Sequence, residues 1–268
     1  MFCQRKINAP LRIIYQTNWK VVTFPIILFI TIQVWLLKSN LIIYTKSGAV
    51  RGRKETTFIK HKEYTAFKGI PYAEPPINEL RFLPPVPVKP WFEVKDGSHF
   101  GQNCIQFATN GEIIGDEDCL FLNIYTPFAY QNESTLLPVM VSIPFGGFTK
   151  GHGEDHVYGP DFLIEQDVIV VTFNHRLSVL GFMSLGTPEY SGNMGLKDQQ
   201  LTLKWIRDNI EYFGGDKDKV TIFGLSSGSL AAHTHVLAES SKGLFQRTIQ
   251  MSSSFLLSSC FKRQNHLE

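Results

Sequence analysis

The fold is decided by residues 220–229, which read Val-Thr-Ile-Phe-Gly-Leu-Ser-Ser-Gly-Ser. An apolar run typical of a strand enters a Gly-x-Ser-x-Gly pattern, and residues 227–238 continue as a helix candidate. The two glycines remove side chains where the chain turns sharply, so the hydroxyl of Ser226 is expected to stand exposed at the edge of the sheet. This context favours a catalytic nucleophile over the alternative, an ordinary Gly/Ser turn.

A second pattern lies upstream, where residues 138–148 form an apolar strand candidate that runs into Gly146 and Gly147. In a hydrolase built around a Gly-x-Ser-x-Gly turn, such a loop supplies backbone N–H groups to the substrate oxygen. The N–H groups of Gly146, Gly147 and Ser227 are therefore expected to form an oxyanion hole. Each such donor typically stabilises the transition state by roughly 2.7–4 kcal/mol. A Gly-Gly hairpin is the alternative for this segment taken alone.

Short stretches rich in β-branched and aromatic residues alternate with helical patterns in the second half of the chain. Helical spacing of leucine and isoleucine predicts a helix over residues 194–212 that stops at Gly214 and Gly215. Strands that alternate with helices form parallel sheets, so we expect an α/β architecture preceded by an antiparallel region. The predicted strands are residues 41–45, 64–68, 120–125, 138–143, 168–173, 219–223 and 246–251.

Composition and cysteine spacing exclude several functions. The chain has 268 residues, of which 43% are hydrophobic, enough to bury one sizeable core. A net charge of +2, without a basic cluster interleaved with aromatic residues, argues against a nucleic-acid partner. No two cysteines have Cys-x-x-Cys spacing, so neither a structural metal nor a redox dithiol is expected. The four cysteines are Cys3, Cys104, Cys119 and Cys260.

The residues alone leave the pairing of Cys104 and Cys119 open. These cysteines flank a loop that contains glycine, and a disulfide between them requires folding in an oxidising compartment. Two buried free thiols are the alternative. The sequence Asn132-Glu133-Ser134 is an N-glycosylation sequon, which fits a lumenal or secreted domain.

The N-terminus is typical of a membrane-targeting segment. Residues 21–37 carry no charge and follow a stretch with four basic residues and no acidic one. Their 17 residues lie at the lower limit for a spanning helix, and residues 38–40 offer no clear cleavage site, which favours a signal-anchor over a cleaved signal peptide. A buried core segment is the alternative.

Residues 46–251 resemble the type-B carboxylesterase and cholinesterase family, and insect esterases most closely. Several ordered blocks carry the resemblance, so coincidence is a poor explanation. The blocks are Ala66–Pro76 (AFKGIPYAEPP), Arg81-Phe82, Glu117–Pro127 (EDCLFLNIYTP), Asn174–Leu177 (NHRL), Gly192–Gln199 (GNMGLKDQ), Phe213–Asp216 (FGGD) and the pattern around Ser226.

The resemblance implies an α/β-hydrolase fold, which in this chain stops after the helix that follows Ser226 and one further strand. It implies hydrolysis of small-molecule carboxylic esters through an acyl-enzyme at Ser226, with no cofactor and no metal. Gly146, Gly147 and Ser227 match the oxyanion hole of the family. Cys104 and Cys119 match a loop disulfide of the family. Two pairs look like buried structural ion pairs, Arg176 with Asp198 and Arg81 with Glu117.

The chain departs from the family pattern around the nucleophile. Leu225 stands where the family has an acidic residue, and Ser227 stands where it has alanine. The loss of the acid makes the pocket wall more apolar and changes the electrostatic environment of a histidine base. Pro144 and Phe145 replace a histidine or aromatic residue and the first glycine of the oxyanion loop. Because Phe145 disfavours positive φ, the loop is expected to be displaced from its position in the family.

The chain is also short for the family, whose members are roughly twice this long with the triad in the order Ser, Asp/Glu, His. His233 and His235 are expected to lie on the helix after Ser226 and to point away from its hydroxyl, and His266 follows the end of the resemblance. We therefore expect neither the triad acid nor the triad histidine in this chain, and ester turnover by the chain alone below about 1 s⁻¹.

These observations predict three segments. Residues 1–40 form a basic N-terminus with the signal-anchor or signal segment, residues 41–251 form a partial esterase domain, and residues 252–268 form a divergent tail typical of a truncated product. The main functional hypothesis is a serine carboxylesterase whose triad is incomplete in this chain. The alternative is a catalytically inactive binding, adhesion or truncated member of the same fold.

Overall fold

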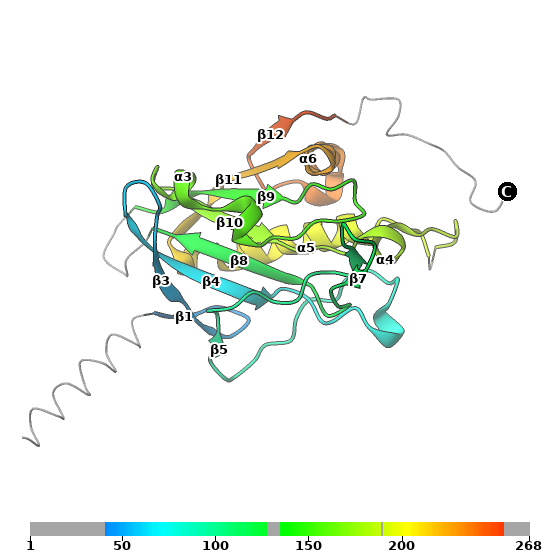
Figure 1. The fold of residues 1–268 in the computed structure, drawn as a ribbon, viewed down its shortest axis with the longest axis horizontal. Helices are drawn as coiled ribbons and strands as arrows, with labels where there is room; N and C mark the ends of the chain where they lie inside the picture. The colour runs from blue at the N-terminus through cyan, green and yellow to red at the C-terminus, as the bar shows by residue number, and fades with distance from the viewer. Residues whose placement is uncertain (1–40, 128–134, 189, 255–268) are drawn as a thin grey trace, which may run out of the picture. The chain divides into compact units, whose positions relative to one another are not determined.

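A computed structural model describes residues 41–127, 135–188 and 190–254, and a seven-stranded mixed sheet organises them (Figure 1). The strand order is β12-β11-β9-β10-β8-β4-β3. The bounds are β3 Arg53–Thr56, β4 Glu63–Pro71, β8 Phe121–Thr126, β9 Leu137–Ile143, β10 Ile169–Phe173, β11 Gly215–Leu225 and β12 Arg247–Met251. Six of these strands coincide with predicted strands, so the predicted α/β architecture is confirmed.

The sheet divides into an antiparallel and a parallel half, as the sequence predicts. Strands β3, β4, β8 and β10 pair antiparallel with one another in that order. Strands β10, β9, β11 and β12 pair parallel. Parallel neighbours present their carboxyl ends at the same edge, so the loops after β9 and β11 meet there.

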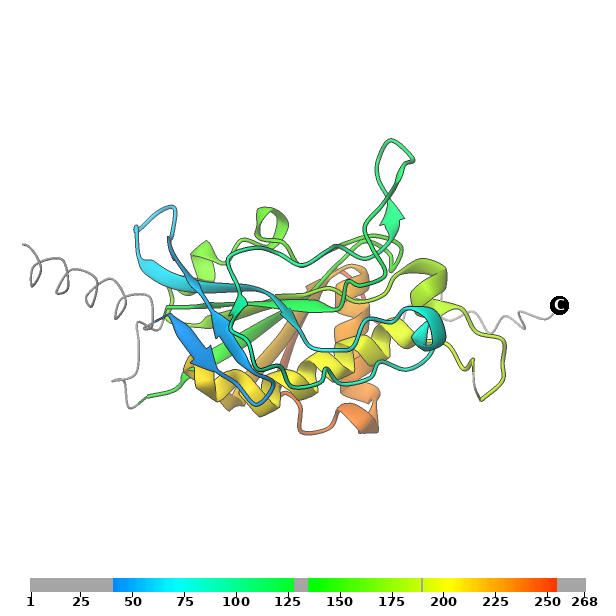
Figure 2. The same cartoon turned by 90° about the horizontal axis from the view of Figure 1, so that it is seen from below.

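Helices cover both faces of the sheet (Figure 2). The helices α5 (Met194–Asn209) and α6 (Ser227–Leu237) lie on one face, and the short helices α2 (Asp155–Tyr158) and α3 (Asp161–Ile164) lie on the other. The predicted helix over residues 194–212 is α5 followed by a 3₁₀ turn, Ile210–Phe213. Gly214 ends this turn with φ of 81°, a conformation that suits glycine. Shorter elements are α4 (Ser178–Phe182) and the 3₁₀ turns Asn78–Leu80 and Glu239–Ser241.

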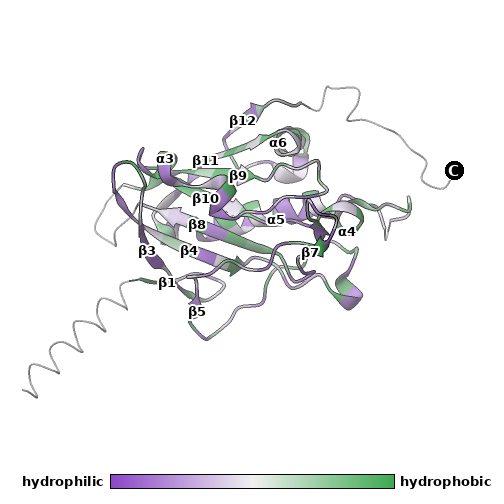
Figure 3. Ribbon diagram, in the orientation of Figure 1, coloured by the Kyte–Doolittle hydropathy of each residue, from purple (hydrophilic) through white to green (hydrophobic). Residues whose placement is uncertain are grey.

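The core lies between the central strands and α5. All five residues of β10, Ile-Val-Val-Thr-Phe, are buried, as expected for a strand covered on both faces. Each buried aliphatic or aromatic side chain stabilises the fold by roughly 1.5–3 kcal/mol relative to an exposed one. Figure 3 shows the contrast between the hydrophobic β9 and the hydrophilic edge strand β3. The rings of Phe67 and Phe213 pack edge to face, with centroids 5.0 Å apart.

Two small sheets flank the large one. Strands β1 (Ile42–Tyr44), β2 (Ala49–Arg51) and β5 (Lys95–Asp96) form a three-stranded sheet, which contains the predicted strand at 41–45. Strands β6 (Gln106–Phe107) and β7 (Ile113–Ile114) form an antiparallel hairpin. The hairpin extends away from the rest of the described residues (Figure 2). The Phe107 and Ile113 side chains are exposed.

The base of this hairpin is closed by a disulfide between Cys104 and Cys119. Both cysteines are buried, and 15 positions separate them in the sequence. The disulfide implied by the family resemblance is therefore present, and the alternative of two free thiols is wrong.

Reduction of the Cys104–Cys119 disulfide is expected to lower the free energy of unfolding by about 3 kcal/mol, because a closed loop of this length restricts the unfolded chain. Urea unfolding with and without reductant, compared with a Cys104→Ala/Cys119→Ala variant, measures the effect. The variant should show no response to reductant. Peptide mapping of a non-reduced digest that finds both thiols free would contradict the prediction.

Three predicted features lie outside the described residues. They are the apolar segment 21–37, the sequon at Asn132 and residues 255–268, which make up most of the predicted tail. Within the residues that the structure describes, no helix has the length and apolar character needed to cross a membrane.

Candidate functional site

The chain turns sharply at Ser226, between β11 and α6. Ser226 has φ of 54° and ψ of −121°, a backbone conformation that non-glycine residues rarely adopt and that is held by surrounding structure when it occurs. Its N–H donates to the Met251 carbonyl over 3.0 Å, and its carbonyl accepts the Leu230 N–H at 3.0 Å. Ser226 is exposed whereas the next residue, Ser227, is buried. The geometry is that of a nucleophile elbow.

The glycines on either side of Ser226 allow the strand and the helix to approach closely. A Cβ added at Gly224 would lie 2.4 Å from the Gly228 carbonyl carbon. A Cβ added at Gly228 would lie 2.4 Å from the Ile143 carbonyl oxygen. No side chain fits at either position, which is the physical reason for the Gly-x-Ser-x-Gly pattern.

The glycine loop after β9 meets the elbow. Gly224 of β11 pairs with Ile143 of β9, so the two strands end side by side. The Gly147 N–H donates to Ser227 Oγ over 2.9 Å, across 80 positions of sequence. The structure thus brings together the predicted residues Gly146, Gly147, Ser226 and Ser227, and their catalytic roles remain predictions.

The expectation that Phe145 displaces the glycine loop after β9 assumed that a positive φ is needed at this position. Phe145 does not have positive φ; the left-handed residues are Gly146, Gly147 and Phe148, with φ of 126°, 65° and 61°. The Phe145 N–H donates to Tyr158 Oη over 2.7 Å. Burial raises the pKa of Tyr158 to about 12, so this phenol stays protonated near neutral pH. Sequence reasoning missed Tyr158, which lies in a four-residue helix without a motif.

Arg176 and Asp198 form a buried ion pair. Arg176 Nε and Nη2 donate to the two Asp198 carboxylate oxygens over 2.9 and 2.7 Å, and the Arg176 backbone N–H donates to Oδ2 over 3.0 Å. A fourth donor, Nη1, bonds to the Leu83 carbonyl over 2.8 Å. The pair connects the loop after β10 to α5 and holds the scaffold rather than the nucleophile.

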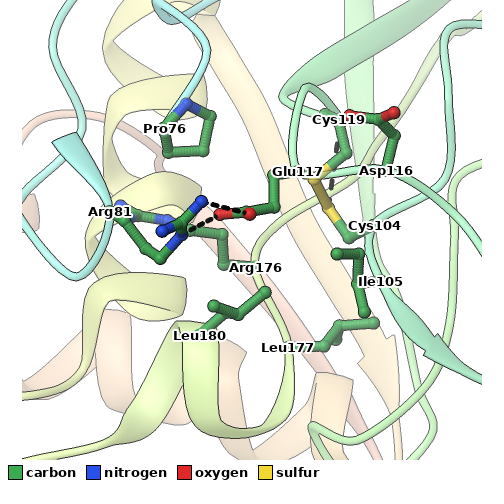
Figure 4. Close-up of a pocket in the computed structure, with 10 residues that line it drawn as sticks. All are labelled: Pro76, Arg81, Cys104, Ile105, Asp116, Glu117, Cys119, Arg176, Leu177 and Leu180. Carbon is green, nitrogen blue, oxygen red and sulfur yellow. Dashed lines mark hydrogen bonds and ion pairs between the residues drawn. A yellow bond between two sulfur atoms is a disulfide. The ribbon is translucent and has the colours of Figure 1, made fainter. Parts of the chain in front are cut away.

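Arg81 and Glu117 also pair, but the expectation that this pair is buried is wrong. Two hydrogen bonds of 2.6 and 2.7 Å join them (Figure 4). The Arg81 side chain is 40% exposed. The carboxylate of Glu117 raises the pKa of Arg81 by hydrogen bonding and charge. The adjacent cavity of about 10 Å³ has about the space that one water molecule needs, and neither Ser226 nor Gly147 lines it.

Two buried histidines near the site are held away from Ser226. His235 Nδ1 lies 2.9 Å from Ser241 Oγ, and its Nε2 lies 3.0 Å from Gln199 Oε1. His175 Nδ1 lies 2.9 Å from the Arg176 carbonyl oxygen. Burial lowers the pKa of both rings. In the described part of the chain, Ser226 Oγ forms no hydrogen bond with a histidine.

The buried His235 is expected to make the fold sensitive to acid. Burial, with a smaller contribution from His175, lowers its pKa to about 4, whereas an unfolded histidine titrates near 6.5. The unfolded state therefore binds the proton first, and the stability present above about pH 6.5 falls by about 3 kcal/mol as the pH approaches 4. Urea unfolding at pH 7.5 and pH 5 should show a smaller loss in His235→Gln. An equal loss in both proteins would contradict this.

Comparison with known proteins identifies the family of this chain. The profile of the carboxylesterase family matches residues 39–267. Juvenile hormone esterase of Tribolium castaneum is 45% identical over 221 residues, covering 81% of this chain and 37% of that protein. Esterase B1 of Culex pipiens is 41% identical over 230 residues, covering 85% of this chain and 42% of that protein. The chain spans about two fifths of the length of these relatives.

The structural comparison gives the same result. Juvenile hormone esterase from Manduca sexta, solved with OTFP covalently attached, superimposes with a TM-score of 0.74 and 39% identity, covering 80% of this chain and 41% of that one. The fold is therefore the α/β-hydrolase fold that the resemblance implied. The match over residues 39–267 and the similarity to insect esterases show that this chain belongs to the carboxylesterase family.

Proposed function

We propose that this chain supplies the nucleophile and oxyanion hole of a serine carboxylesterase. The observation that carries the proposal is the contact between the two separate loops, in which Gly147 N lies 2.9 Å from Ser227 Oγ directly beside the Ser226 elbow. The esterase relatives, one of which holds a covalently attached molecule, support a covalent mechanism.

In the proposed reaction, Ser226 Oγ attacks the carbonyl carbon of a small ester and its proton passes to a general base. The negative charge that develops on the carbonyl oxygen is stabilised by N–H groups of Gly146, Gly147 and Ser227. The alcohol leaves with a proton, and water then hydrolyses the acyl-enzyme to release the acid and regenerate the hydroxyl. In this fold the acid and the histidine follow the serine in sequence, so they are expected beyond α6.

A fluorophosphonate probe tests the proposal, because it forms a stable bond only with an activated serine. The expected result is labelling of one peptide, the one that contains Ser226, together with loss of p-nitrophenyl acetate hydrolysis. The longest product of the gene that carries these residues should be used beside the 268-residue chain. Ester turnover that continues after complete labelling of Ser226, or labelling at another serine, would overturn the proposal.

Ser227→Ala is expected to raise kcat/KM for a neutral aliphatic ester by about 2- to 10-fold. In the unliganded site the Ser227 hydroxyl accepts the Gly147 N–H, which the transition state needs. Breaking that hydrogen bond costs roughly 0.5–1.5 kcal/mol net, and alanine removes the cost while keeping the backbone N–H of residue 227. Steady-state kinetics of Ser227→Ala and Ser227→Thr measure the effect. A fall in the alanine variant would show that the hydroxyl assists catalysis.

The proposal includes a secretory route. The Cys104–Cys119 disulfide supports folding in an oxidising compartment, and the sequon at Asn132 and the apolar segment 21–37 fit this route. We assign residues 1–40 to targeting and residues 41–251 to the esterase domain, and the match to the family profile continues to residue 267. Enzymatic deglycosylation is expected to lower the mass of the protein and to leave the mass of Asn132→Gln unchanged. This result would support the assignment to a lumenal or extracellular compartment.

A further inference from the structure

The segment that follows the oxyanion loop brings two imidazoles and one carboxylate together. His152, Glu154 and His156 occupy alternate positions, and their candidate ligand atoms all lie within 4.8 Å of one another. The two imidazole rings have centroids 4.8 Å apart, and His156 Nδ1 lies 3.3 Å from Glu154 Oε2. We propose that these three residues form a binding site for a zinc-type divalent metal ion.

Hydrogen bonds fix the backbone at the residues before and after His152, Gly151 and Gly153. The Gly151 N–H donates to Gln106 Oε1 over 2.9 Å, and Gln106 Nε2 returns a bond to the Gly151 carbonyl. The Gly153 N–H donates to Asn174 Oδ1 over 2.8 Å, and its carbonyl accepts Asn123 Nδ2 at 3.0 Å. The segment is therefore preorganised, so little conformational entropy would be lost when a ligand binds.

The Glu154 carboxylate is oriented toward the histidines. Asn103 Nδ2 donates to Glu154 Oε1 over 2.6 Å, which leaves Oε2 beside His156. The neighbouring Asp155 has a different partner, because Lys68 Nζ donates to its Oδ2 over 2.7 Å. In metal sites, a carboxylate that binds the metal typically accepts a hydrogen bond from a second residue, which fixes its orientation.

The donor set and its spacing suit Zn²⁺. Two histidines and one carboxylate with further positions left to water form a common zinc environment. Ligands about 2.1 Å from a tetrahedral zinc lie roughly 3.4 Å from one another, close to the distance between Glu154 and His156. The His152 ring would have to rotate to reach this spacing, because the three candidate ligand atoms now lie up to 4.8 Å apart. That rotation gives up the long 3.3 Å hydrogen bond from the Glu154 N–H to His152 Nδ1. The His156 side chain is 62% exposed, which gives the ion a route in.

Zinc binding by the untagged full chain tests the site without reference to esterase activity. Cys3 and Cys260 are replaced by serine in every sample so that thiolates do not bind the metal. After dialysis against a chelator, titration with Zn²⁺ in competition with a chromophoric chelator is expected to show one equivalent bound per chain. His152→Ala and His156→Ala should each abolish this equivalent, and Asn103→Ala should weaken binding by about 10- to 100-fold.

His99→Ala is the matched control, because it removes another exposed imidazole and should bind zinc as the parent does. Circular dichroism and the retained Cys104–Cys119 disulfide verify that each variant is folded. If His152→Ala is misfolded, the exposed His156 decides the result. The proposal is overturned if the parent binds no saturable equivalent, or if His156→Ala binds zinc with the affinity of His99→Ala.

Discussion

Replacement of Asp198 by alanine is expected to lower the free energy of unfolding by about 3–5 kcal/mol, because it leaves the Arg176 guanidinium buried without a counter-charge. Asp198 is fully buried and accepts three hydrogen bonds from Arg176, one of them from the backbone. Most single domains are stable by only 5–15 kcal/mol, so a loss of this size would unfold much of the population. Urea unfolding followed by circular dichroism measures it.

Two further variants distinguish the cost of leaving a buried charge unpaired from the cost of losing an ion pair. Glu63→Ala removes an ion pair with Lys54 whose side chains are 59% and 68% exposed, and it should cost less than about 1 kcal/mol. The double variant Arg176→Met/Asp198→Leu removes both charges and should be more stable than Asp198→Ala. If Asp198→Ala is no more destabilised than Glu63→Ala, the pair does not hold the scaffold as described.

Replacement of Ser226 by alanine is expected to abolish ester hydrolysis, by on the order of 10⁶-fold in kcat where the acid and histidine are present. In the proposed mechanism Ser226 supplies the oxygen that becomes acylated, and the next residue in the chain, Ser227, is buried. Activity that remains should be roughly 10³–10⁴-fold above the water reaction, because the oxyanion donors and substrate binding persist. Single-turnover and steady-state assays with p-nitrophenyl acetate measure the change.

Ser227→Ala is the matched control for Ser226→Ala, because it removes the adjacent hydroxyl and keeps every backbone donor. It should retain fluorophosphonate labelling, while Ser226→Ala should show none. Both variants need the same melting temperature as the parent for the comparison to report on chemistry. Equal rates in the parent and in Ser226→Ala would refute the nucleophile role, and the proposed esterase function with it.

The sequence predicts the central sheet well because each long strand is a run of β-branched and aromatic residues. Strand β10 buries all five of its residues, β9 buries four of seven, and β11 buries every second residue from Val220 to Gly224, so these strands stand out as hydrophobic runs in the sequence. Strands β2, β3 and β5 to β7 are only two to four residues long, and the pairing of β2 with β5 joins Val50 to the distant Lys95. Local propensity carries too little information to find such pairs.

The candidate site also has features that the sequence predicts and features that it does not predict. The elbow at Ser226 is predictable because a steric requirement for glycine at two fixed positions leaves a pattern in the sequence. The contact of Tyr158 with the oxyanion loop and the exposure of Arg81 depend on packing, which leaves no such pattern. Cysteine spacing does not predict the cluster of His152, Glu154 and His156, because the cluster contains no cysteine.

The closed loop between Cys104 and Cys119 has a consequence for the integrity of the chain. Its exposed hairpin presents apolar side chains and a Gly-containing turn to solvent, as protease-sensitive sites do. A single cleavage within residues 108–112 would leave both fragments joined through sulfur, since the cut lies inside the 15-residue separation. The cleaved protein would run as one species without reductant and as two with it. Strands β4 and β8, which lie on opposite sides of the cut, would stay tethered in the same sheet.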